Sequence, residues 1–140
     1  MRLALLSLAL LAGCGGYTPE EDVYYAPDPG TSSGPQGTGK IGIQWTFNGA
    51  PPTTQACTGV AQLILTIDYG GGSVTISPIP CTAGRLRYDH LPEGTATIIL
   101  EGYDAGRCRT HLGTAKNVKV TSTVPDPFSP TISLLPKSCR

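Results

Sequence analysis

Charged residues are scarce in this chain of 140 residues, and neither sign prevails. Only 14% of the residues are charged, and ten Lys and Arg balance ten Asp and Glu. A chain without net charge has no electrostatic attraction for nucleic acid or for an anionic membrane surface. We therefore expect no nucleic-acid partner.

Helix-favouring residues are also few, whereas residues that favour turns are abundant. The chain has one Met, 18 Gly and 13 Pro. Such a composition is typical of short strands joined by tight turns rather than of long helices.

The usual signatures of metal sites and catalytic sites are missing. The sequence has two histidines, His90 and His111, and no Cys-x-x-Cys pair that would indicate zinc. No calcium-loop motif and no nucleophile elbow are present. We predict no catalytic, cofactor-binding or metal-binding residues. The less favoured alternative is an envelope hydrolase, which would need one histidine to meet a serine and a carboxylate.

The N-terminus has the pattern of a secretory signal. Arg2 is followed by an apolar run from Leu3 to Leu11 that is interrupted only by Ser7. This run is too short to span a bilayer as a permanent helix, and its length and flanks are typical of a cleaved signal peptide. We predict a signal peptide over residues 1–13.

The residues Leu11-Ala12-Gly13-Cys14 resemble the bacterial lipobox. The resemblance implies that Cys14 carries a thioether-linked lipid, becomes the first residue after cleavage, and is acylated at its amine. Two or more acyl chains give stable anchoring. Gly15, rather than Asp, after the cysteine implies sorting to the outer membrane. The sequence thus predicts a palmitate-bearing lipoprotein of the cell envelope. Its partner is the membrane, which it binds through the covalent lipid at Cys14.

The cysteine count agrees with a lipid on Cys14. There are five cysteines, and an odd number in an exported protein requires an explanation. Without Cys14, four cysteines remain. They can form disulfides because the compartment outside the inner membrane is oxidising. Three pairings are possible, and the expected strand positions favour Cys57 with Cys81 and Cys108 with Cys139.

Residues 14–39 are predicted to be a disordered tether. After the cysteine they contain six Gly, four Pro, four acidic residues and no basic residue. Such a stretch cannot bury enough apolar surface to offset the entropy of ordering. Tyr24-Tyr25 is a candidate docking motif, although we interpret it as part of the linker.

The pattern changes at Lys40, where the predicted domain of residues 40–140 begins. Apolar residues alternate with polar ones over residues 41–47, and further short strands follow every 8 to 12 residues. Seven or eight short strands without a helix indicate an antiparallel β-sandwich of immunoglobulin-like size.

Residues 91–106, LPEGTATIILEGYDAG, resemble a pattern of carboxypeptidase-regulatory-like and transthyretin-like sandwich domains. The resemblance implies a scaffold or adhesion-type module rather than a catalyst. We therefore expect a non-enzymatic interaction or structural module, with an envelope protein or a glycan as its partner.

The alternative is a carbohydrate- or peptide-binding module, which would expose an aromatic platform or an arginine cluster. Trp45 alternates in phase with core positions, so we place it in the core. Arg85 with Arg87, and Arg107 with Arg109, each point to one face of a strand. The four would form a basic patch only if their strands were neighbours.

Overall fold

The computed structural model describes residues 23–25, 37–123 and 128–139. Most of these residues lie in strands, and no α-helix occurs among them. No described segment forms a helix that is long and apolar enough to cross a membrane. The elements are β1 (Tyr24–Tyr25), β2 (Gly39–Phe47), β3 (Gln62–Asp68), β4 (Ser73–Ile79), the 3₁₀ helix η1 (Cys81–Ala83), β5 (Arg85–Leu91), β6 (Gly94–Tyr103), β7 (Arg109–Val120) and β8 (Thr131–Pro136). The predicted all-β class is confirmed.

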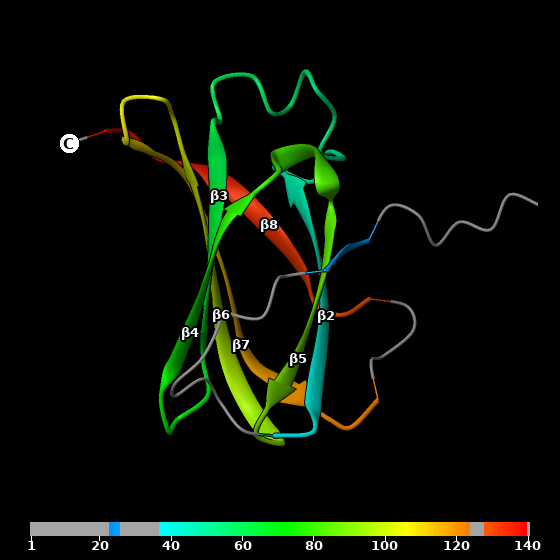
Figure 1. Ribbon diagram of the computed structural model, residues 1–140. Coiled ribbons are helices and arrows are strands. Elements are labelled where there is room, and N and C mark those ends of the chain that lie inside the picture. Colours follow the sequence, from blue (N-terminus) through cyan, green and yellow to red (C-terminus); the bar gives the residue numbers. More distant parts are fainter. Residues whose placement is uncertain (1–22, 26–36, 124–127, 140) are drawn as a thin grey trace, which may run out of the picture.

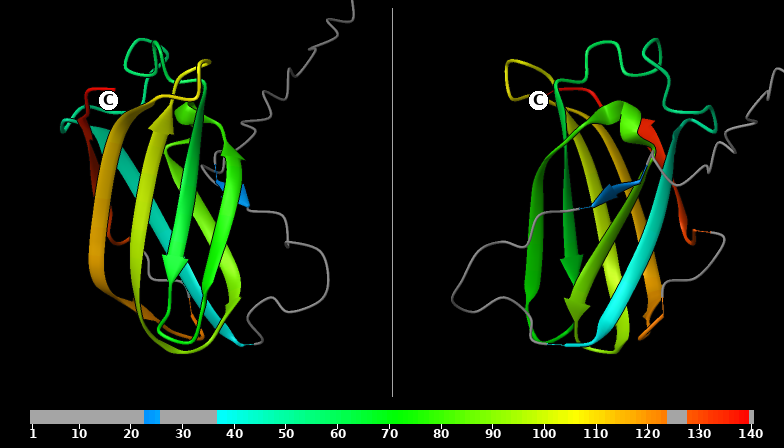
Figure 2. Two further views of the ribbon diagram at one scale, coloured as in Figure 1. Left: turned by 90° about the vertical axis from the view of Figure 1, so that its left-hand side faces the viewer. Right: turned by 45° about the vertical axis from the view of Figure 1, so that its right-hand side comes forward.

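The strands form one curled sheet with the order β1-β5-β2-β8-β7-β6-β3-β4. Figure 1 shows β2 and β5 on one side, β3, β4, β6 and β7 on the other, and β8 running obliquely between them. Figure 2 shows the same curl from two further directions. The predicted sheet was purely antiparallel, whereas the observed sheet is mixed. Strand β2 pairs in parallel with β8, and β1 pairs in parallel with β5.

Strand β8 joins the two halves of the sheet. Its residues 131–134 pair with β2, and Leu135 and Pro136 pair with β7. Alternating patterns predict strands but do not reveal which strand each edge will meet, so this change of partner had no counterpart in the sequence pattern.

The core lies inside the curl and is built from the alternating positions that the sequence indicated. In β2, Ile41, Ile43, Trp45 and Phe47 are buried, and the equivalent faces of β3, β5 and β6 are buried as well. No polar or charged residue is buried among the described residues. The hydrophobic effect therefore fixes which face of each strand points inward.

Strand β7 is one continuous strand that contains a bulge. Its twelve residues pair with β6, and the register shifts by one residue where Ala96 faces Val118 and Ile98 faces Ala115. Asn117 takes a positive φ of 56° at this bulge. Asparagine tolerates the left-handed conformation, so the strand continues through this polar stretch instead of ending there.

Candidate functional site

The structure brings the four domain cysteines together in the two predicted pairs. Cys57 is bonded to Cys81 and Cys108 to Cys139, and the Cα atoms of each pair are 5.8 Å apart. That separation is typical of disulfides. The first bond joins the loop after β2 to η1, and the second ties the end of the chain to the start of β7. Cys14 lies outside the described residues.

A network of polar groups surrounds the β6–β7 turn next to the second disulfide. Asp104 accepts a hydrogen bond from the backbone N–H of Cys108 at 2.8 Å, which stabilises the turn. Arg109 forms a 2.7 Å ion pair with Glu101, and the Tyr103 hydroxyl donates to the same carboxylate at 3.3 Å. Burial and the neighbouring Glu101 raise the pKa of the Tyr103 hydroxyl. Arg109 and Glu101 neutralise each other's charge, and the hydrogen bonds hold this end of the hairpin together.

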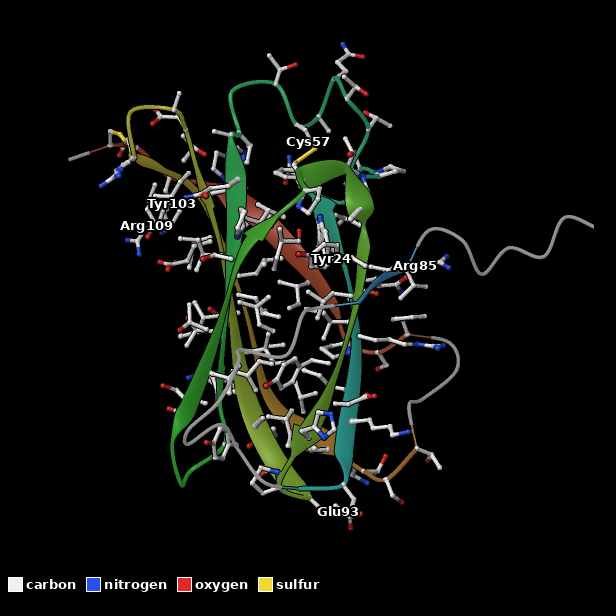
Figure 3. The ribbon with its side chains drawn as sticks, in the orientation of Figure 1. Tyr24, Cys57, Arg85, Glu93, Tyr103 and Arg109 are labelled. Carbon is white, nitrogen blue, oxygen red and sulfur yellow. A yellow bond between two sulfur atoms is a disulfide. The ribbon has the colours of Figure 1, made fainter. Side chains whose placement is uncertain are left out.

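The condition for a basic patch of the four arginines, that their strands are neighbours, is not met. Strands β5 and β7 are separated by β2 and β8, and Figure 3 shows Arg85 and Arg109 on opposite sides of the molecule. Instead, both β5 arginines contact one aromatic ring. The guanidinium carbons of Arg85 and Arg87 lie 5.7 and 5.1 Å from the centre of the Phe128 ring. These distances are typical of cation–π contacts.

The two histidines lie at opposite ends of the domain. His90 is exposed, three residues before Glu93, whereas His111 lies near Arg109 at the far end (Figure 3). The His111 ring packs edge-on against the Phe47 ring, with the two ring centres 5.0 Å apart. It also shares a 3.0 Å hydrogen bond with the Thr110 hydroxyl. Burial lowers the pKa of the His111 imidazole. Within the described part of the chain, no hydrogen bond joins either histidine to a serine or a carboxylate.

Trp45 belongs to the core, as predicted, and so provides no exposed platform for a sugar. Only 1% of its surface is exposed. Its indole N–H donates to the backbone oxygen of Cys81 at 3.0 Å, so the side chain links β2 to η1 beneath the first disulfide.

A groove of about 980 Å³ opens where the two ends of the curled sheet approach each other. We call this place the seam: β4 ends here, η1 crosses it and β5 begins beyond it. The groove is lined by η1, the loop after β2 and the start of β5, together with residues 44–46 of β2 and Thr131 of β8. The segment before the domain also contributes, through Val23 and Tyr24.

Tyr24 was considered as part of a docking motif but was assigned to the tether. Phe128 was not identified from the sequence, and it lies about 40 residues from the arginines that it contacts. The adjacent pair Tyr24-Tyr25, in a stretch otherwise poor in large apolar side chains, is the one local signal that marks the docked segment.

No protein-family model, curated protein or solved structure matches this chain.

Proposed function

We propose that this protein is a lipoprotein of the cell envelope, anchored through lipid on Cys14, whose β-domain is a non-enzymatic interaction or structural module. The cysteine arithmetic carries the proposal. The chain has five cysteines, and the four in the domain are consumed by two disulfides. Cys14, which stands in the Leu11-Ala12-Gly13-Cys14 motif, is the cysteine that this pairing leaves over.

The proposal includes a domain of the immunoglobulin-like or transthyretin-like kind. Two facing halves of a sheet with a common apolar core support this interpretation. Strand β8 pairs with both halves and so joins them into one sheet. Two disulfides in a domain of about 100 residues are typical of exported proteins, because the cytosol keeps thiols reduced.

Lipidation is tested by growing bacteria that express the full chain with radiolabelled palmitate. The wild-type protein is expected to take up the label, and Cys14→Ser is expected to lose it. Cys139→Ser is the matched control, since it removes a cysteine without touching the motif, and its label per molecule should equal that of the wild type. Label that persists in Cys14→Ser contradicts the proposal.

The destination membrane is tested separately by fractionating envelopes on a density gradient. The wild-type protein is expected in the outer-membrane fractions. Gly15→Asp is expected to move it to the inner-membrane fractions, while Gly16→Ala, one residue further on, should leave it in place. A wild-type protein found in the inner membrane contradicts this part of the proposal.

A further inference from the structure

The segment that precedes the domain contributes a strand to the sheet. In β1, Tyr24 lies opposite Leu86 and Tyr25 opposite Arg87, in parallel with β5. Strand β5 would otherwise present an open edge, and unpaired edges readily accept another extended segment. The chain's own residues occupy part of this one.

Tyr24 also reaches the opposite end of the sheet. Its side chain is half-buried and packs against the core, and its hydroxyl donates to the backbone oxygen of Pro78 in β4 at 3.3 Å. Strands β5 and β4 are separated by five strands within the sheet, yet both contact this residue. Figure 3 shows Tyr24 between the two halves of the curled sheet. Tyr24 thus bridges the seam.

Val23 adds to the same contact, because it is half-buried and lines the groove beside Tyr24. The seam therefore binds a short extended segment through backbone pairing, an apolar side chain and a tyrosine. These are the elements of strand-addition recognition, in which the main chain supplies affinity and side-chain contacts supply specificity.

We propose that the seam is a strand-binding site whose occupant is this chain's own segment Val23–Tyr25, and that its docking sets how far the domain can lie from the membrane. The inference about distance rests on the proposed lipid anchor at Cys14. Val23 is only nine residues from Cys14, whereas Lys40 is 26 residues from it.

Docking of Val23–Tyr25 shortens the greatest possible distance between Cys14 and the domain. A chain spans at most about 3.3–3.6 Å per residue, so the docked segment limits the reach from Cys14 to the domain surface to about 30 Å. If the segment is released, the reach to Lys40 rises to about 90 Å. The docked domain is thus held next to its own membrane, and release allows it to reach a more distant partner.

Docking is tested first by hydrogen exchange in the full chain with Cys14→Ser, which needs no lipid. Tyr24→Ala is expected to speed amide exchange in β5 by about tenfold or more, because the edge is no longer covered. Tyr17→Ala is the matched control, since it removes a tyrosine upstream of β1, and should leave β5 unchanged. Equal exchange in both variants overturns the proposal. Protection of β5 that grows with protein concentration also overturns it, because the occupant would then be a second copy.

The distance is tested with the full chain coupled through its Cys14 thiol to maleimide-bearing lipids in vesicles. Trp45, the only tryptophan, then donates energy to dansyl groups at the bilayer surface. Tyr24→Ala is expected to reduce the transfer, and Tyr17→Ala to leave it unchanged. Equal transfer in the two variants overturns the inference. Because the anchor is chemical, this result is independent of whether cells lipidate Cys14, which palmitate labelling decides.

Discussion

Gly113 occupies the point at which β8 leaves β7, and replacing it with alanine should destabilise the domain. Leu135 and Pro136 of β8 pair with β7, but the preceding residues pair with β2. A Cβ atom on Gly113 would lie 2.5 Å from Cγ2 of Ile132 and 2.9 Å from the backbone oxygen of Ser133. The backbone of β8 passes directly over this residue, so a glycine is required here by the close approach of two strands.

The expected cost follows from these contacts. Adding a methyl group to a well-packed interior costs about 1–3 kcal/mol. The Ser133 oxygen is backbone, so it can move only if β8 shifts against β2, which places the cost in the upper part of that range. Alanine also restricts the unfolded chain, which offsets about 0.4–1 kcal/mol. We expect Gly113→Ala to lower the free energy of unfolding by about 1–2 kcal/mol.

Urea unfolding followed by the fluorescence of buried Trp45 measures this change, with both disulfides intact. For a slope of about 2 kcal/mol per molar urea, the midpoint should fall by about 0.5–1 M without a change in slope. Gly71→Ala is the matched control, because its added Cβ would meet only the Tyr69 ring at 3.8 Å, an ordinary contact. Equal midpoints for the two variants would refute the argument that β8 needs a glycine beneath it.

Three further predictions concern the core and its cross-links. Trp45→Phe removes the hydrogen bond to the Cys81 oxygen and should cost about 1–3 kcal/mol, measured by urea unfolding with circular dichroism; a cost below 0.5 kcal/mol would contradict it. Replacing Cys57 and Cys81 together by serine opens a bridge across 24 residues, and the chain-entropy model expects a loss of about 3.5 kcal/mol in the same assay; an unchanged midpoint would count against the bond. Burial lowers the pKa of His111, so the unfolded chain binds the proton more readily and stability should fall as the pH drops through about 6.5. Midpoints at pH 7.5 and 5 should therefore differ less in His111→Gln than in His90→Gln, and equal differences would refute this reasoning.

Much of the local architecture can be predicted from alternation and turn residues. The β3–β4 hairpin forms around three consecutive glycines, and Cys57 and Cys81, the pair that the expected strand positions favoured, are bonded to each other. Alternation also predicted that Trp45 points inward. These features depend on residues near each other in sequence, or on the rule that apolar residues face the core.

The partners of the strands could not be predicted in the same way. An alternating pattern in residues 131–136 indicates a strand, but pairing with β2 in parallel depends on where the rest of the sheet leaves an open edge. Whether the four arginines would form one patch was left open for this reason, and the structure decides against it because β5 and β7 are separated by two strands. Phe128 contacts Arg85 and Arg87 through the same long-range arrangement.

The sequence by itself determined the all-β class and the inward faces of the strands, because these follow from composition and period. It favoured the two disulfide pairs among three possible pairings. Only the tertiary structure decided that β8 joins the two halves of the sheet, that Gly113 lies beneath it, and that Tyr24 bridges the seam. Each of these depends on backbone and side chains that meet across long sequence separations. Periodicity describes one segment at a time, so it carries no information about such meetings.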